Sequence, residues 1–313
     1  MTGTNVSIVI PAKDEEGSIE PLCHAIVKEL TKLNTGYEII FVDDGSTDKT
    51  FDILSHLHKN NPKIKIIKLR GNFGKSIALQ SGFKLAKGQV IITLDADLQD
   101  DPKEIPNFLA KINEGYDLVS GWKKERHDPL SKTLPSKIGN FTTRFLTGIK
   151  IHDLNCGFKA YRKEVVNNLN LYGELYKYIP VLAEKQRFRV GEIIVTHHSR
   201  QFGKSKFGWG RNIKGFLDLL TVVFLTSYLS RPGHFFGTSG IISFLGGFII
   251  GLYITYLRIT TGTIQNRHPL LFLGMLLMIV GIQLVTTGLL AEMFVSFNQK
   301  SSLTSKYIKD ILN

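Results

Sequence analysis

The chain has 313 residues and a formal net charge of +12, with 43% hydrophobic and 21% charged residues. This length allows one full-sized domain and a smaller part, because single cores stop growing near roughly 250 residues. Between positions 232 and 299 the only charged residues are Arg258, Arg267 and Glu292, so nearly all the charge lies on the first 231 residues and the tail. This asymmetry argues against a uniform soluble protein, favours an anionic membrane surface as partner, and gives no reason to expect nucleic acid.

The first half of the chain alternates apolar, strand-like runs with helical segments. Strands are expected at 6–12, 37–44, 64–69, 89–97 and 116–122, and helices at 18–33, 48–58, 75–86 and 102–113. The runs are continuously apolar, which is typical of parallel strands buried on both faces. We therefore predict an α/β domain over residues 1–208, with a mostly parallel, Rossmann-like sheet and helices on both faces.

Two later segments have the composition of interfacial helices. Residues 135–150 mix aromatic and aliphatic side chains with lysines and an arginine, and residues 209–232 are basic at the start and apolar afterwards. Such segments lie along a membrane surface, with the apolar side chains in the lipid and the basic ones outside. Ordinary helices packed on the sheet remain the alternative for both.

The region 233–298 is predicted to hold two transmembrane helices. Residues 235–257 and 270–291 carry no charge, and each run is long enough to cross about 30 Å of hydrocarbon. Two buried helices of a soluble core are the alternative. The apolar run at 6–11 is too short for a signal peptide, so the large domain and the tail at 299–313 are expected to be cytoplasmic.

Acidic residues follow three of the predicted strands. Asp14 and Glu16 follow the first, Asp43 and Asp44 end the second, and Asp95, Asp97 and Gln99 end a later one. Ligands of parallel sheets bind beyond these strand ends, and Asp95 and Asp97 share a face if their strand continues. Each segment alone could be a turn or a helix cap, but together they would repel one another without a cation or a donor-rich ligand. A nucleoside diphosphate with Mg²⁺ or Mn²⁺ meets that requirement.

Several motifs in this order resemble one enzyme family. They are VSIVIPAKDEE, VDDGSTD, GNFGKSIALQSG, DADLQDDP, DLNCGFKAYRKEV and HHSRQFGKSKF. The chain resembles the family-two glycosyltransferases of GT-A fold, and specifically the group of dolichol-phosphate mannose synthase and polyprenyl-phosphate glucosyltransferases. The resemblance extends over some two hundred residues.

The resemblance implies roles for particular residues. The nucleotide-sugar would be bound by Pro11, Asp14, Glu16, Asp43, Asp44, Lys75, Asp95 and Ala96, and the metal by Asp95, Asp97 and Gln99. The acceptor side would include Asp153, Cys156, Gly157 and Lys159. Catalytic roles would fall to Asp97, Arg126, Arg200, Ser205 and Lys206. Two cationic groups could bind the phosphates: Arg126, with Lys123 and Lys124 beside it, and the loop at 200–206. Which of them binds the donor phosphates and which the acceptor phosphate is left open.

Other nucleotide-binding motifs are excluded by their spacing. Gly71 and Gly74 of GNFGKS are separated by two residues where a Walker A loop needs four, and no GxGxxG follows the first strand. Cys23 and Cys156 lack the paired spacing of a metal site.

The resemblance implies inverting transfer of a hexose from a nucleotide-sugar to a polyprenyl phosphate. UDP-glucose is the first expected donor and GDP-mannose the second, in a bacterial inner membrane. The alternatives are transfer to a glycan or another lipid, and a non-catalytic nucleotide-sugar-binding adaptor. Homo-oligomerisation through the spans or the tail is left open.

Overall fold

The computed structural model describes residues 5–124, 130–198, 232–264 and 266–299. The chain divides into two compact units, Met1–Val222 and Val223–Asn313. The predicted juxtamembrane segment at 209–231 and the tail from residue 300 lie outside the described residues.

The first unit is built on a seven-stranded sheet with the order β3-β2-β1-β4-β6-β5-β7. The strands are β1 (Val6–Ala12), β2 (Tyr37–Asp43), β3 (Ile64–Lys68), β4 (Val90–Thr93), β5 (Leu118–Trp122), β6 (Lys159–Arg162) and β7 (Val190–Ile194). Only β6 is antiparallel to its neighbours β4 and β5, while the other pairs are parallel. The predicted mostly parallel sheet is therefore confirmed, with β6 and β7 added to the predicted strands.

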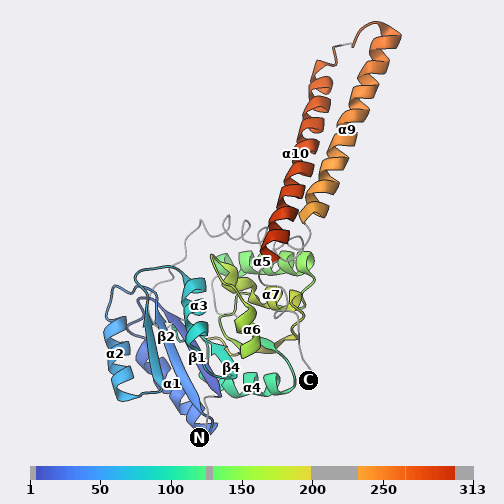
Figure 1. Ribbon diagram of the computed structural model, residues 1–313. Coiled ribbons are helices and arrows are strands. Elements are labelled where there is room, and N and C mark those ends of the chain that lie inside the picture. The colour runs from blue at the N-terminus through green and yellow to red at the C-terminus, as the bar shows by residue number, and fades with distance from the viewer. Residues whose placement is uncertain (1–4, 125–129, 199–231, 265, 300–313) are drawn as a thin grey trace. The chain divides into compact units, whose positions relative to one another are not determined.

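Helices cover both faces of this sheet (Figure 1). Their bounds are α1 (Ile19–Lys32), α2 (Thr50–Asn60), α3 (Lys75–Leu85), α4 (Ile105–Asn113), α5 (Leu130–Thr147), α6 (Lys163–Asn168) and α7 (Ile179–Lys185), with short 3₁₀ turns at Pro102–Glu104 and Leu175–Tyr178. Helices α1, α2 and α4 share one buried apolar cluster with the sheet, and α3, α6 and α7 contact the strands from the other side.

The alternation of buried residues along β1 explains this two-sided packing. Ile8 and Ile10 belong to the cluster under α1, whereas Val9 between them faces α3. Helix α3 approaches the sheet closely at Gly82, where an added Cβ would lie 2.3 Å from Val9 Cγ1. A larger residue at position 82 would therefore push α3 away from the strand ends that it flanks.

The second unit is a hairpin of α9 (Pro232–Thr261) and α10 (His268–Gln299). Its apolar parts, Gly233–Thr261 and His268–Phe294, have 29 and 27 residues and are long and apolar enough to cross a membrane. At 1.5 Å per residue each spans roughly 40 Å, more than the hydrocarbon core requires. Both helices extend beyond the predicted 235–257 and 270–291, because short polar segments at their ends continue the helical geometry.

Glycines bring the two helices of the hairpin close together. They recur every seven residues: Gly233, Gly240 and Gly247 on α9, and Gly274, Gly281 and Gly288 on α10. An added Cβ at Gly247 would lie 2.4 Å from the carbonyl oxygen of Gly274, and one at Gly240 would lie 2.7 Å from that of Gly281. Small residues at such spacing let helix backbones approach in lipid, where no hydrophobic force between helices exists.

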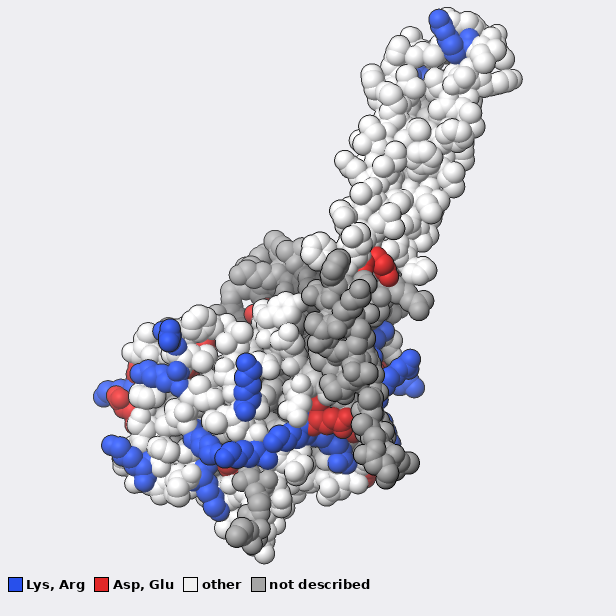
Figure 2. Space-filling model, in the orientation of Figure 1, with Lys and Arg blue, Asp and Glu red and all other residues white. Residues whose placement is uncertain are grey.

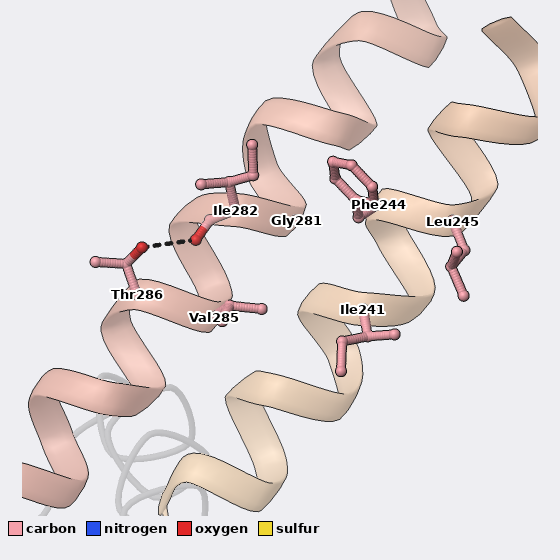
Figure 3. A pocket seen from close by; sticks show the side chains of 7 residues that line it. All are labelled: Ile241, Phe244, Leu245, Gly281, Ile282, Val285 and Thr286. Atoms are coloured by element: carbon pink, nitrogen blue, oxygen red, sulfur yellow. Dashed lines mark hydrogen bonds between the residues drawn. The ribbon is translucent and has the colours of Figure 1, made fainter.

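One face of the hairpin has a hollow of about 270 Å³ beside Gly281 (Figure 3). It is lined by Ile241, Phe244, Leu245, Gly281, Ile282, Val285 and Thr286. The hydroxyl of Thr286 donates to the Ile282 carbonyl of its own helix at 2.9 Å, so it is already satisfied. The lining therefore suits hydrocarbon.

Charge is distributed very differently on the two units. Figure 2 shows lysines and arginines spread over the first unit, whereas the hairpin surface is nearly uncharged between its ends. The acidic Glu292 lies near the end of α10, where its carboxylate accepts a hydrogen bond from the Gly233 backbone N–H at 3.0 Å. Gly233 lies at the start of α9, and a carboxylate beside a helix N-terminus is stabilised by the positive end of the helix dipole. This interaction accounts for the presence of Glu292 in the apolar hairpin.

Candidate active site

The acid-rich segments come together at the edge where the parallel strands end. The register pairs Ala12 of β1 with Asp43 of β2, and Val9 of β1 with Thr93 of β4. The antiparallel β6 starts at this same edge, since its first residue Lys159 pairs with Thr93. The segments that follow β1, β2 and β4 and the segment that precedes β6 are thereby brought to one side of the sheet.

The two aspartates at the end of β2 have different surroundings. Both oxygens of Asp44 accept backbone N–H groups, from Phe73 at 2.7 Å and Gly74 at 2.9 Å, so Asp44 fixes the turn before α3. Asp43 is fully buried and accepts from the Ser46 N–H at 3.0 Å through Oδ1. Among the described residues its Oδ2 has no hydrogen-bond partner. Oδ2 of Asp43 is therefore an unused acceptor, whereas both oxygens of Asp44 already hold the turn before α3.

The acids after β1 also bind backbone groups. Asp14 accepts from the Thr47 N–H at 2.7 Å and Glu16 accepts from the Lys49 N–H at 3.1 Å, so both tie the loop after β1 to the loop after β2. Asp14 adopts a left-handed backbone conformation with φ of 46°. Pro11 lies within β1, paired with Val42 of β2. Contact of these residues with a nucleotide stays a prediction.

The segment after β4 turns where a continuing strand was expected. Strand β4 ends at Thr93, and Leu98 adopts φ of 59° after a turn at 96–97. The expectation that Asp95 and Asp97 share a face by strand alternation is wrong, because no strand continues there. Ala96 and Asp97 are buried, and Asp95 is half-buried.

Asp95 lies among cations. The ammonium of Lys75 contacts its Oδ1, and Gly157 backs it closely, since an added Cβ there would lie 2.5 Å from the carboxylate atoms. Burial acts to raise the pKa of Asp95, but the charges of Lys75, Lys123 and Lys159 outweigh it and hold that pKa below its ordinary value. Asp95 is thus a carboxylate at neutral pH.

Lys123 has a buried partner of its own. Its ammonium lies 2.8 Å from Oδ1 of Asp100, whose side chain is fully enclosed. Burial acts to lower the pKa of Lys123, and the neighbouring Asp100 raises it well above the ordinary value, so the lysine stays charged. Lys123, named from the sequence as part of a cationic set beside Arg126, thus has Asp100 as its partner in the structure, and its contact with a phosphate stays a prediction. Sequence reasoning gave no signal for this pair.

The predicted acceptor-side residues are interior residues. Asp153, Cys156 and Lys159 are each at most 3% exposed. The Lys159 ammonium donates to the carbonyls of Leu154, at 3.3 Å, and Cys156, and burial lowers its pKa. These side chains support the segment behind Asp95, and their contact with an acceptor stays a prediction. Arg126, Arg200, Ser205 and Lys206 lie outside the described residues.

Both cysteines are expected to be unreactive in the folded protein. Burial is the main cause that raises the pKa of Cys23 to about 11 and that of Cys156 to about 12, so the reactive thiolate is scarce at neutral pH. We expect almost no reaction with a disulfide reagent at pH 8 and two thiols per chain after unfolding in denaturant. Rapid labelling of the folded chain would contradict the packing around either residue.

Gln99 links the turn after β4 to the segment after β7. Its backbone carbonyl accepts from the His198 N–H at 2.9 Å, and its side-chain Nε2 donates to the His198 carbonyl at 3.3 Å. A carbonyl only accepts, so the amide nitrogen must face His198, and Oε1 is left for another partner. Among the described residues no three His, Cys, Asp or Glu side chains form a metal-binding group. A cation held here would therefore combine aspartate oxygens with the Gln99 oxygen and oxygens of a ligand, a set that suits Mg²⁺ or Mn²⁺.

Replacement of Gln99 by leucine is expected to weaken Mn²⁺ binding by roughly tenfold, because it removes the side-chain oxygen and the side-chain hydrogen bond to the His198 carbonyl. The free Mn²⁺ signal in an electron paramagnetic resonance titration measures this. Gln99→Glu keeps an oxygen and should retain more of the affinity than Gln99→Leu. Equal affinity of all three proteins would exclude Gln99 from the cation site.

Helix α5 presents its aromatic face outward. Phe141 and Phe145 are 69% and 79% exposed, while Asn140, Thr143 and Thr147 on the opposite side are buried. Asn140 donates to the His152 carbonyl at 3.1 Å. This pattern matches the predicted interfacial helix, because exposed phenylalanines of a membrane protein gain by entering the lipid boundary.

We therefore expect α5 to touch lipid. Phe145→Trp in the full chain, placed in lipid nanodiscs, should gain fluorescence that brominated lipids quench, measured as the increase over the parent chain. Lys59→Trp on α2 is the matched exposed control and should be quenched much less. Equal quenching at both positions would show that the α5 face does not enter the bilayer.

A mostly parallel sheet with one reversed strand and an aspartate-rich turn after β4 is the architecture of the GT-A fold. The fold agrees with that of glucosyl-3-phosphoglycerate synthase from Mycobacterium tuberculosis, crystallised with Mn²⁺, uridine diphosphate and phosphoglyceric acid. The TM-score is 0.54 at 17% identity, over 72% of this chain and 78% of that one, which supports the fold alone.

The chain belongs to glycosyl transferase family 2, whose family model matches residues 7–169. It is 36% identical over 308 residues to dodecaprenyl-phosphate galacturonate synthase of Rhizobium johnstonii, covering 97% of this chain and 91% of that protein. It is also 36% identical over 290 residues to undecaprenyl-phosphate 4-deoxy-4-formamido-L-arabinose transferase of Pectobacterium atrosepticum, covering 92% and 87%. The resemblance drawn from the motifs is thereby confirmed, and the protein is a glycosyltransferase.

Proposed function

We infer that this enzyme transfers a sugar from a nucleoside diphosphate-sugar to a polyprenyl phosphate, with inversion at the anomeric carbon. Two observations support the acceptor: relatives over nearly the whole chain are named for polyprenyl-phosphate products, and the chain carries a membrane-length hairpin. The catalytic unit would lie on the cytoplasmic face of a bacterial inner membrane, where nucleotide-sugars are available.

The observation that supports the donor site best is the turn at 95–99 with its surrounding lysines. Asp95, Asp97 and Gln99 would hold Mg²⁺ or Mn²⁺, which when bound neutralises charge on the two phosphates of the leaving group. The buried Oδ2 of Asp43, which has no hydrogen-bond partner among the described residues, would accept a hydrogen bond from the base or ribose. Positive charge around Asp95 would favour the departing nucleoside diphosphate.

The acceptor needs little activation by the protein. A phosphate monoester has a second pKa near 6, so it is largely a dianion at neutral pH and attacks without a strong general base. The task of the chain is then to orient this oxygen opposite the leaving group and to exclude water. Arg126 and the basic residues at 200–206 are the proposed cations for the phosphates of donor and acceptor.

The identity of the donor sugar is to be determined by a transfer assay. UDP-glucose and GDP-mannose are the donors expected from sequence, and the names of the relatives add galacturonate and 4-deoxy-4-formamido-L-arabinose to the candidate sugars. The purified full chain should be incubated with undecaprenyl phosphate, Mg²⁺ or Mn²⁺ and each radiolabelled donor. Label that enters the organic phase is then counted.

Label from one donor, absent when unphosphorylated undecaprenol replaces the phosphate, is the expected result and names the sugar. Label transferred to both lipids, or only to an added glycan, would overturn the phosphate acceptor. Binding of a donor without any transfer would favour the adaptor alternative.

A further inference from the structure

The ion pair between Lys75 and Asp95 joins two elements at the proposed donor site. Lys75 is the first residue of α3, and Asp95 follows β4, so the contact joins the start of a helix to the segment after a strand. Their side chains are 24% and 30% exposed, so a ligand from solvent can reach both. An ion pair at this exposure is weak enough for a ligand to replace it.

Asp95 has little freedom to turn away from such a ligand. The backbone at Gly157 lies against its carboxylate, where even a Cβ would come within 2.5 Å. Lys75 is by contrast long and flexible, and its ammonium lies 5.1 Å from the centre of the Tyr176 ring, which offers a second position for a cation. When a cation approaches Asp95, the lysine is therefore the partner that moves.

The two other lysines near Asp95 cannot exchange in this way. Lys123 is paired with the enclosed Asp100, and Lys159 is buried and donates to two backbone carbonyls. Either would leave a buried group unpaired on moving, which is costly. Of these three lysines, only Lys75 is accessible to solvent and can leave Asp95 without leaving another buried group unpaired.

We propose that Lys75 is an exchangeable counter-ion, which neutralises Asp95 until a divalent cation replaces it and then pairs with the diphosphate of the donor. This rests on the proposed function, since it takes Asp95 as a ligand of the donor's metal. Two positive groups on one carboxylate repel each other, so lysine and metal compete for Asp95. A diphosphate brought by that metal supplies the displaced ammonium with a stronger anionic partner.

The test separates binding of the metal from binding of the nucleotide. Mn²⁺ affinity is measured by electron paramagnetic resonance on the full chain in detergent, first with Mn²⁺ alone and then with UDP, with GDP in parallel. For Lys75→Met we expect Mn²⁺ alone to bind roughly three- to tenfold more tightly, and the nucleoside diphosphate in the presence of Mn²⁺ to bind more weakly by a similar factor. Lys84→Met, which removes a lysine at the exposed end of the same helix, should change neither.

Tighter binding of Mn²⁺ alone together with weaker binding of the nucleoside diphosphate is the result that exchange of Lys75 for the cation predicts. Lys75→Arg should restore nucleotide affinity toward that of the parent chain. Unchanged or weaker binding of Mn²⁺ alone in Lys75→Met would overturn the proposal, even if nucleotide affinity falls. Failure of the proposed function would be seen in the parent chain itself. The parent chain would then give no labelled lipid with any donor, or would bind no Mn²⁺ in the presence of either nucleoside diphosphate.

Discussion

Asp97→Asn is expected to lower kcat for sugar transfer by about a hundredfold or more, because the variant loses a charged ligand of the proposed cation, which would stabilise the leaving group. Asp97 is 8% exposed and accepts the Gln99 N–H at 3.2 Å. Asparagine preserves the size and one acceptor, so the turn should keep its shape. Initial rates of lipid labelling at saturating donor, over a range of Mn²⁺ concentrations, measure the loss.

A neighbouring acid provides the control for this substitution. Asp101 accepts the Lys103 N–H at 3.0 Å at the start of a 3₁₀ turn, a position that asparagine also fills well. Asp101→Asn should therefore keep a rate within a few-fold of the parent chain. If Asp97→Asn were as active as Asp101→Asn, the cation site would have to be placed elsewhere.

Lys123→Met is expected to destabilise the catalytic unit by about 3–5 kcal/mol, since it leaves the enclosed Asp100 carboxylate without its cation. A loss of this size corresponds to a Tm lower by roughly 10 °C. Thermal unfolding of the detergent-solubilised chain, followed by circular dichroism, measures it. The double variant Lys123→Met with Asp100→Asn should recover much of the loss, because the uncompensated charge is removed.

This prediction separates two interpretations of Lys123. A free phosphate-binding lysine would lose activity on substitution and leave Tm unchanged, whereas the buried pair predicts loss of Tm first. Lys124→Met is the matched control, because Lys124 is exposed beside the same strand end. Equal Tm values for the two methionine variants would show that the ion pair with Asp100 contributes little.

The strands β1 to β5 and their order along the chain could be predicted from the sequence, because continuous apolar runs indicate burial on both faces, whereas the short β6 and β7 were missed. The direction of β6 could not be read, since a run such as KAYR carries no information about which way its neighbours point. Pairing across more than sixty residues, as between Thr93 and Lys159, is decided by the tertiary fold.

The sequence predicted which segments form the candidate site, but it predicted few of the contacts between them. The motif at 95–99 is local in sequence, so its position beyond β4 followed from the strand. Its partners are distant: Lys75 reaches Asp95 from α3, and His198 reaches Gln99 from the segment after β7. Likewise, the different surroundings of Asp43 and Asp44 depend on backbone N–H groups at 73 and 74, which no pattern of residue types reveals.

The sevenfold spacing of glycines in the hairpin limits how this protein can change in length. The position numbers of each facing pair, such as Gly240 with Gly281, add to the same total, so the three contacts share one alignment. Inserting one residue into either helix would rotate everything beyond it by about 100° and shift it by about 1.5 Å. Glycines on the far side of the insertion would then meet bulky neighbours. Lengthening is therefore expected to be tolerated between the two helices and rejected within them.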